Sequence, residues 1–204
     1  MYLKLGKIKI HITFAFAAFT AFAANSASGE FLMLVFVSAL LHECVHLCFL
    51  LGYGCRELRL TLQPGGAGIR CSGMELLDVR QNVLALLSAP AANLLLAAML
   101  YAAAGFFSAE KLFSAARCNL CLGAVNLLPL SFSDGGRTLC AVLAEKRGKK
   151  TAARVCRCAE YVSLLLLLAG TVAAAVCRKP WSGAAVFTGY CFVFALGKLL
   201  KKEK

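Results

Sequence analysis

Residues Phe31 to Gly52 read FLMLVFVSALLHECVHLCFLLG and determine the class of fold. The run is long enough to cross the hydrocarbon core of a bilayer as one helix, which takes roughly 20 residues. Inside it stand His42, Glu43 and His46. Ionisable side chains are costly at that depth and are usually functional where they occur. The run therefore predicts a membrane span that carries a chemical site.

The rest of the chain shares this apolar character. Of its 204 residues 60% are hydrophobic, and the mean hydropathy is +0.75, whereas an ordinary soluble domain is about half apolar. We expect an all-α polytopic membrane protein, a single membrane-embedded domain over residues 1–204 without a cleavable signal peptide. The six candidate spans run from about Ile8 to Ala24, Phe31 to Gly52, Val83 to Phe107, Leu112 to Leu130, Tyr161 to Cys177 and Trp181 to Leu200.

The charges predict the orientation of these spans. There are 22 basic against 10 acidic residues and a net charge of +12, but no basic stripe alternates with exposed aromatic residues, which argues against a nucleic-acid partner. In the six-span arrangement most basic residues fall on one side of the membrane. The positive-inside rule then places both termini, including the tail 198–204, in the cytoplasm of a multi-pass plasma-membrane protein. The four basic groups are Lys4 to Lys9, Arg56 to Arg80, Arg137 to Arg157 and Lys198 to Lys204.

The segment 53–82 differs from the apolar runs around it. Leu58 and Leu60 alternate with Arg59 and Thr61, and a turn sequence follows at Pro64, so we expect a β-hairpin at the cytoplasmic interface. Strand edges cannot stay unpaired in lipid, so the hairpin should lie against protein or in a wet cleft. A peptide added as a further strand would satisfy such an edge, which makes Arg59 and Thr61 candidate substrate-binding positions.

The H-E-C-V-H motif predicts a zinc site. On a helix, residues i and i+4 share a face, so His42 and His46 can reach one ion while Glu43 stays free to move protons. Zinc lowers the pKa of bound water and polarises a carbonyl, and a neighbouring carboxylate can act as the general base. We therefore expect Glu43 to be the catalytic residue of a hydrolytic reaction.

A catalytic zinc needs one more protein ligand than these two histidines supply. The candidate carboxylates are Glu30, Glu110, Glu160 and Asp134. Asp134 is the best placed of them, because it follows the fourth predicted span at the cytoplasmic end, close to the depth of the two histidines. Read alone, an aspartate before two glycines would be a turn residue.

These motifs together resemble the site-2 proteases, which are intramembrane zinc peptidases. The resemblance rests on H-E-C-V-H, on S-A-P-A-A-N at Ser88 to Asn93 and on N-L-L-P-L-S-F-S-D-G-G before Arg137. It implies that Asp134 completes a site for one Zn²⁺ and that Asn126 holds substrate or stabilises the oxyanion. The implied partners are the lipid bilayer and membrane-associated protein or peptide substrates, while the resemblance names no inhibitor and no oligomeric state.

Within that family, two spans before the β segment are similar to the sporulation branch, whose members process a sigma factor precursor. Many members of that branch carry a C-terminal CBS domain, and we expect none here because the chain stops soon after its last apolar run.

Two other function classes stay open. A zinc-binding transporter or channel would need a path across the membrane, whereas the key residues gather towards one face. A non-catalytic scaffold derived from such a protease would not need Glu43. A serine intramembrane protease is disfavoured because no convincing pair of serine and histidine is visible.

Other polar residues in the spans are interpreted structurally. We expect Asn93 to pair with a backbone carbonyl freed by Pro90, and Arg117 and Asn119 to satisfy neighbouring helices. The eleven cysteines are expected mainly as small buried apolar residues without a disulfide framework. The C-x-x-C that begins at Cys118 has no second pair at zinc-ribbon spacing, so no structural metal is expected there.

Overall fold

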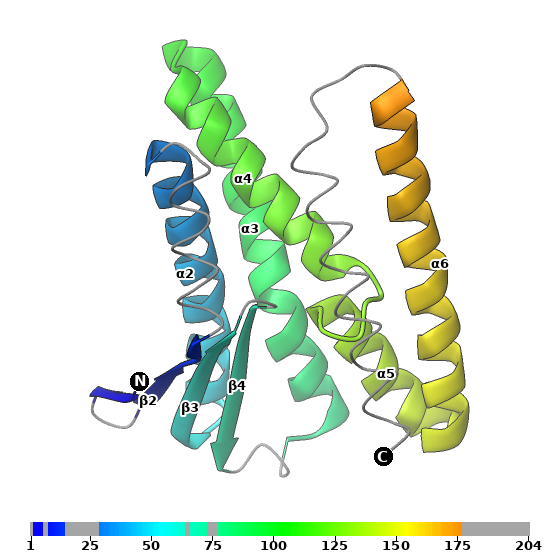
Figure 1. Ribbon diagram of the computed structural model, residues 1–204. Coiled ribbons are helices and arrows are strands. Elements are labelled where there is room, and N and C mark those ends of the chain that lie inside the picture. The colour runs from blue at the N-terminus through cyan, green and yellow to red at the C-terminus, as the bar shows by residue number, and fades with distance from the viewer. Residues whose placement is uncertain (1, 6–7, 15–28, 64–65, 73–76, 177–204) are drawn as a thin grey trace. The chain divides into compact units, whose positions relative to one another are not determined.

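The computed structural model describes residues 2–5, 8–14, 29–63, 66–72 and 77–176, and these form helices with one small sheet (Figure 1). The chain divides into two compact units, Met1–Leu127 and Leu128–Lys204. Each is described here by itself, and the single domain over residues 1–204 stays a prediction.

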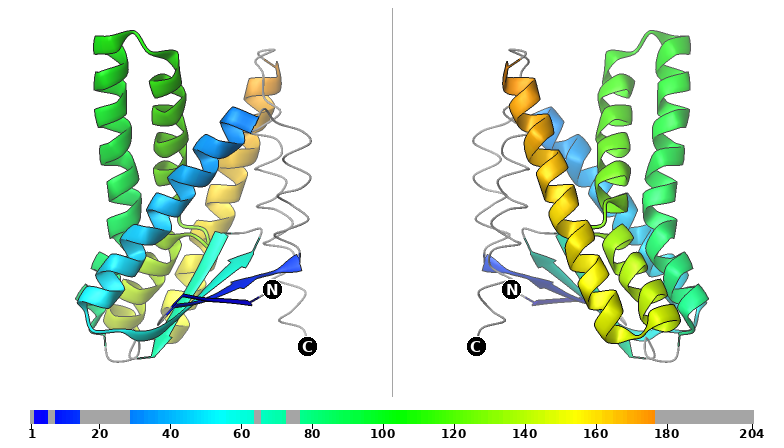
Figure 2. Two further views of the ribbon diagram at one scale, coloured as in Figure 1. Left: turned by 90° about the vertical axis from the view of Figure 1, so that its left-hand side faces the viewer. Right: turned by 90° about the vertical axis from the view of Figure 1, so that its right-hand side faces the viewer.

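The first unit is built on three helices, α2 (Gly29–Gly52), α3 (Val79–Phe107) and α4 (Glu110–Leu127). A left-handed Ser108 with φ of 49° ends α3, and α4 returns beside it in the antiparallel direction (Figure 2). At the far end of this group, Lys111 forms an exposed ion pair of 3.0 Å with Glu30. The first turns of α2 and α4 therefore lie at the same end, as the predicted span directions require.

Local chemistry explains where α3 begins and how closely α4 approaches it. Asp78 caps α3 by accepting a hydrogen bond from the Gln81 backbone, and the Gln81 side chain completes the capping box. Gly123 lets α4 come close, because a Cβ there would lie 3.1 Å from the carbonyl oxygen of Pro90. The third and fourth predicted spans are therefore helices, α3 beginning earlier and α4 ending earlier than expected.

A four-stranded sheet adjoins these helices, in the order β1 (Tyr2–Leu5), β2 (Ile8–Ile12), β3 (Arg56–Gln63) and β4 (Gly66–Ser72). The predicted hairpin is confirmed as the antiparallel pair β3 and β4, whereas β2 pairs with β3 in parallel. One face packs on Leu50 of α2 and Ala85 of α3 through Leu58, Leu60 and Ile69.

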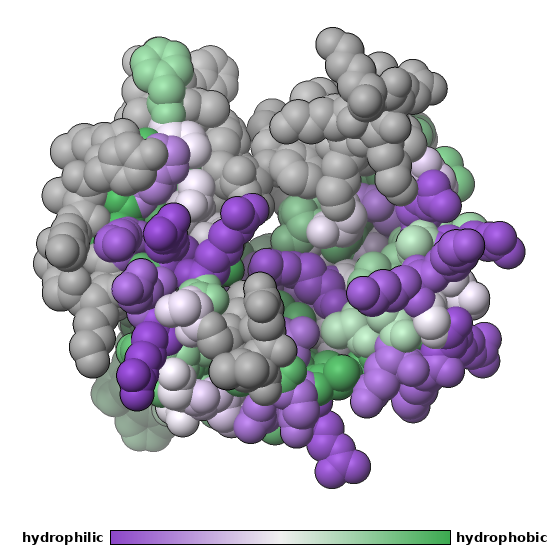
Figure 3. Space-filling view, turned by 90° about the horizontal axis from the view of Figure 1, so that it is seen from below, coloured by the Kyte–Doolittle hydropathy of each residue, from purple (hydrophilic) through white to green (hydrophobic). Residues whose placement is uncertain are grey.

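The opposite face of the sheet carries a row of cations. The register sets Lys9 opposite Arg59 and Arg59 opposite Arg70. Seen from the end where the sheet lies, hydrophilic side chains cover much of the described surface (Figure 3). Two of the four basic groups thus meet on one sheet, in agreement with the prediction that they share a side.

The second unit consists of α5 (Asp134–Arg147) and α6 (Lys149–Val176), joined through Gly148 with φ of 79°. The two helices lie side by side, and Leu130 packs on Leu164. The basic group from Arg137 to Arg157, which lies between the fourth and fifth predicted spans in sequence, belongs to these two helices. Ser133 caps α5, which has Lys146 and Arg147 in its last turn.

Three helices of the described part are long and apolar enough to cross a membrane: Gly29–Gly52, Val79–Phe107 and Lys149–Ala173. The start of the first predicted span is wrong, because Ile8–Ile12 is a strand. The remainder of that span from residue 15 and the whole of the sixth lie outside the described residues. Six spans therefore stay a prediction.

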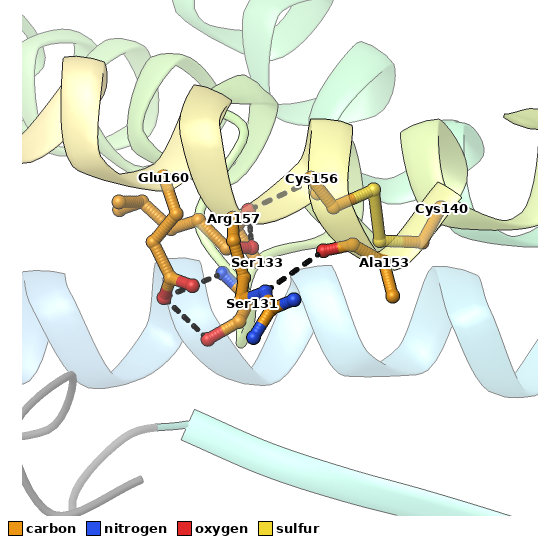
Figure 4. The surroundings of a disulfide bond; sticks show 9 residues. Ser131, Ser133, Cys140, Ala153, Cys156, Arg157 and Glu160 are labelled. Carbon is orange, nitrogen blue, oxygen red and sulfur yellow. Dashed lines mark hydrogen bonds between the residues drawn. A yellow bond between two sulfur atoms is a disulfide. The ribbon is translucent and has the colours of Figure 1, made fainter. Parts of the chain in front are cut away.

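The cysteines differ from the expectation. Cys140 of α5 and Cys156 of α6 form a disulfide, with their Cα atoms 6.0 Å apart (Figure 4). Of the free cysteines in the described segments only Cys55 is fully buried, and several on helix surfaces are exposed. A cysteine on a membrane span can face lipid, and this explains why apolar context in the sequence did not indicate burial.

Candidate metal centre

His42 and His46 lie one turn apart on the buried side of α2. They are 5% and 8% exposed, and their rings meet edge to face with centroids 4.9 Å apart. The spacing of four residues therefore places both imidazoles on the same face of the helix, as binding of one metal ion requires.

Each imidazole is held through its Nδ1 atom. Nδ1 of His42 lies 2.6 Å from Oδ1 of Asn93, and Nδ1 of His46 lies 2.7 Å from the carbonyl oxygen of Ala85. Both partners belong to α3, so the neighbouring helix orients the rings.

Glu43 follows His42 directly and is half-buried on α2. Its Oε2 atom is shielded from solvent. The position next to His42 fits the role of general base predicted from the motif.

Asp134 is the first residue of α5 and is 5% exposed. The Ser133 hydroxyl caps this helix by accepting from the Gly136 backbone N–H, and it also donates to the carbonyl oxygens of Leu128 and Leu130. A carboxylate at a helix N-terminus is favoured by the helix dipole. Arg137, one turn later, approaches Asp134 at 3.9 Å. The loop and cap therefore fix where Asp134 stands.

His42, His46 and Asp134 form a group that could hold a metal ion. Each offers one ligand atom, and these atoms all lie within 4.8 Å of one another. Two imidazole nitrogens and one carboxylate oxygen are a usual set for a catalytic zinc, with the fourth position left for water or substrate. Cys118 and Cys121 belong to no group of this kind in the described segments.

The other predicted site residues belong to α4 and to the sheet. Asn126 is in the last turn of α4, half-buried, and its side chain donates to the Leu122 carbonyl. Arg59 and Thr61 do not lie on a strand edge, and that prediction is wrong. Both belong to β3, which has β2 on one side and β4 on the other, so their backbone groups face existing strands.

Glu30 and Glu160 have other partners. Glu30 binds Lys111, and Glu160 of α6 accepts from the hydroxyl of Ser131 at 2.5 Å and from its backbone N–H at 3.2 Å (Figure 4). The candidate third ligand Glu160 instead anchors the loop that precedes Asp134.

Sequence reasoning missed the part that Asn93 plays, whereas Asn119 contacts the two neighbouring helices as predicted. Asn93 was expected to bind a backbone carbonyl, yet its amide lies between His42 and Asn119. The signal in the sequence was an asparagine inside an apolar run, which marks a paired group without naming its partner.

The chain is similar in sequence to known proteins. The model of peptidase family M50 matches residues 109–170, a part that includes Asp134 but not the two histidines. A zinc metalloprotease of Methanocaldococcus jannaschii is 26% identical over 175 residues, which are 80% of this chain and 50% of that protein. The chain thus spans about half the length of this relative.

The fold is shared with a solved structure. The site-2 protease from Methanocaldococcus jannaschii superposes with a TM-score of 0.65 at 21% identity, over 95% of this chain and 92% of that one. The resemblance predicted from the motifs is therefore confirmed: the chain is similar to site-2 proteases in fold and to peptidase family M50 in sequence. The sporulation branch stays a prediction.

Proposed function

We propose that the chain is an intramembrane zinc metalloendopeptidase that hydrolyses peptide bonds of membrane-associated proteins. His42, His46 and Asp134 hold one zinc ion, and Glu43 moves the protons. The observation that carries the proposal is the buried group of two imidazoles and one carboxylate, with their ligand atoms within 4.8 Å, beside a glutamate that is not needed as a ligand. An ordinary structural metal site has no use for this glutamate.

Zinc, when bound, supplies a Lewis acid that polarises the scissile carbonyl and makes water acidic enough to attack near neutral pH. Glu43 takes a proton from the attacking water and gives it to the leaving amide nitrogen. Asn126, at the cytoplasmic end of α4 in the predicted orientation, positions the substrate or stabilises the developing oxyanion.

The substrate binds as an added strand. A peptide in a bilayer needs partners for its backbone, and a sheet edge supplies them. Because β3 is internal, the outer strand of the hairpin among the described strands is β4, Gly66–Ser72. The proposal therefore moves the substrate from Arg59 and Thr61 to the outer side of β4.

The chain crosses the plasma membrane six times with both termini in the cytoplasm. Support comes from the ion pair between Glu30 and Lys111. Each of these residues belongs to a connection that is predicted to lie outside the cell. Further support is the register that sets Lys9 beside Arg59, because it joins two basic groups predicted to be inside.

The function is tested by separating the ligands from the base. His42→Ala, His46→Ala and Asp134→Ala should each lower zinc content and abolish cleavage. Glu43→Gln keeps the ligands and the side-chain shape, so it should bind zinc near stoichiometry while turnover falls at least ~100-fold, the usual scale of general acid and base catalysis. His11→Ala is the control, because it removes the third histidine of the chain from a strand outside the proposed metal site.

Substrates are found by comparing the membrane proteomes of cells that carry the native chain or Glu43→Gln. Proteins that accumulate uncut only with Glu43→Gln are candidates, to be cleaved by the purified protein in detergent. Zinc loss in Glu43→Gln would make Glu43 a ligand. Full zinc content in Asp134→Ala would remove Asp134 from the site.

A further inference from the structure

We propose that Asn93, held in place by Asn119, is a positioning residue that fixes His42 in the tautomer and orientation needed to bind zinc. The proposal rests on the zinc site proposed above. It concerns a buried chain of hydrogen bonds that links the helices α2, α3 and α4. Nδ1 of His42 on α2 contacts Asn93 on α3, Asn93 contacts Asn119 on α4, and Asn119 contacts Ser38 back on α2.

One backbone carbonyl determines which atom is the donor and which is the acceptor in every hydrogen bond of this series. The Nδ2 atom of Asn119 lies 3.0 Å from the carbonyl oxygen of Ala115, which can only accept, and 3.0 Å from Oγ of Ser38. The amide nitrogen of Asn119 therefore faces these two atoms and its Oδ1 faces Asn93. Because that oxygen also only accepts, the atom of Asn93 at 2.8 Å must be the donor Nδ2.

The same reasoning ends at His42. With its Nδ2 turned to Asn119, Asn93 presents Oδ1 to the imidazole at 2.6 Å. An amide oxygen accepts only, so Nδ1 of His42 must carry the hydrogen. In the neutral ring the lone pair is then on Nε2. The amide chain therefore selects the nitrogen that His42 can offer to a metal ion.

His46 reaches the same state by a simpler route. Its Nδ1 lies 2.7 Å from the Ala85 carbonyl oxygen, again an acceptor without a hydrogen. Both histidines of the motif thus expose Nε2 for the ion while Nδ1 donates to α3. Metal-binding histidines usually donate their other ring N–H in this way, which fixes the ring and raises its basicity.

Burial makes this series of hydrogen bonds rigid, and breaking it costs free energy. Ser38, Asn93 and Asn119 are 4%, 2% and 3% exposed. Each has a hydrogen-bond partner, and a buried polar group left without one costs about 1–3 kcal/mol. These hydrogen bonds also connect the helices to one another. A purely structural role is therefore the alternative that an experiment must exclude.

The first experiment needs no substitution. The chain has three histidines, so the ring nitrogens of ¹⁵N-histidine-labelled protein in detergent can be assigned with His11→Ala as reference. We expect His42 and His46 to be protonated at Nδ1 in metal-free protein, and zinc to shift their Nε2 signals. A hydrogen on Nε2 of metal-free His42 would overturn the proposal.

The second experiment separates positioning from helix packing. Asn93→Leu removes the acceptor of His42, whereas Asn119→Leu breaks the chain one step further away and leaves Oδ1 of Asn93 in place. Both should lower the thermal midpoint. Asn93→Leu should also weaken zinc binding by about 10- to 100-fold, the usual effect of losing the group that orients a metal ligand. Asn119→Leu, which keeps the acceptor but frees the Asn93 amide to turn, should weaken zinc binding clearly less.

Asn93→Asp supplies the matched rescue. Its carboxylate still accepts from Nδ1 of His42 but cannot donate to Asn119, so zinc affinity should return while the thermal midpoint stays low. The absorption spectrum of bound Co²⁺ should change in Asn93→Leu and be native-like in Asn93→Asp. Equal losses of zinc affinity in Asn93→Leu and Asn119→Leu, in proportion to lost stability, would overturn the positioning role.

These readouts are independent of proteolysis. If zinc binds as expected but no substrate is cut, the peptidase proposal fails and the positioning role of Asn93 stands. If the native chain cleaves substrate with Nε2 of His42 protonated in the metal-free state, the positioning role fails and the peptidase proposal stands.

Discussion

The carbonyl group of Leu130 lies where a side chain on Gly136 would have to begin. A Cβ built at Gly136 would overlap the Leu130 oxygen and come within 2.6 Å of its carbonyl carbon. The loop before α5 therefore folds directly onto the first turn of that helix, and only glycine leaves room for it. Because Asp134 lies between these two residues in sequence, this close approach sets the position of a proposed zinc ligand.

Gly136→Ala should displace the loop and destabilise the protein by at least about 1–3 kcal/mol, the usual cost of overpacking. Zinc affinity should fall with it, because Asp134 moves. The measurements are the thermal midpoint and zinc affinity in detergent. Gly170→Ala is the control on α6, where a Cβ meets nothing within 4 Å, and it should preserve zinc affinity. Native affinity in Gly136→Ala would show that the loop does not position Asp134.

Glu160 should hold the same loop from α6. It accepts two hydrogen bonds from Ser131, so Glu160→Leu leaves both donors without their acceptor and should cost about 1–3 kcal/mol. Glu160→Gln keeps a side-chain oxygen and should stay close to native stability. Denaturation of the two variants, with the exposed Glu145→Gln as a control for charge removal, measures the difference. Loss of zinc from Glu160→Gln with stability intact would instead make Glu160 a ligand.

The sequence predicted the helices of the first unit well, because each rests on a local signal. Phe31 to Gly52 is one uninterrupted apolar run, and the spacing of His42 and His46 alone places both rings on one face. The strand Ile8–Ile12 was missed although Ile8 and Ile10 alternate with Lys9 and His11. The strand is stabilised by pairing with β3, which is distant in sequence. Such a partner cannot be identified from the local sequence pattern.

The site was predictable to a similar degree. Motif spacing was sufficient for His42, Glu43 and His46, and Asp134 followed from its depth and from the family resemblance. Helix α5 was not predicted because it is not an apolar run, although Ser133 before the helix and Gly148 after it are start and stop signals. The role of Asn93 could not be predicted from the sequence, because it depends on how three helices pack together.

Arg59→Glu should stabilise the sheet. Arg59 lies directly opposite Lys9 and Arg70, and like charges in opposed positions destabilise a sheet, whereas opposite charges contribute about 0.2–1 kcal/mol per pair. The thermal midpoint should therefore rise and the gain should shrink with added salt. Thr61→Glu is the control, because Thr61 faces His11 and Gly68. A lower midpoint in Arg59→Glu would show that the row of cations is already neutralised by a bound anion.

The membrane orientation is tested with two lysines at opposite ends of the predicted topology. Lys111 belongs to a predicted outer connection and Lys150 to a predicted inner one. In a background without native thiols, Lys111→Cys in intact cells should react with an impermeant maleimide, whereas Lys150→Cys should react only after permeabilisation. Both residues are exposed, so access to the reagent differs only through the membrane. Labelling of both in intact cells would contradict the six-span arrangement.

The last prediction concerns where substrate meets the sheet. If the peptide adds to β4, a photo-reactive residue at Arg70 should cross-link to it, because Arg70 lies on the strand at that edge. Lys4 gives the matched control, since it is also a basic residue but belongs to β1 at the opposite end of the strand order. Both positions are tested in the Glu43→Gln background, so that uncut substrate stays bound.

Cross-linking at Arg70 should compete with unlabelled substrate and need a folded sheet. Cross-linking at Lys4 alone would move the substrate to β1, and cross-linking at neither would mean that the sheet does not receive it. Proline at a β4 position whose backbone N–H faces outward should weaken cleavage while zinc stays bound, because proline removes the donor that the added strand needs. Together these results decide whether the substrate peptide is held in an extended form at the sheet edge, beside His42 and His46, before hydrolysis.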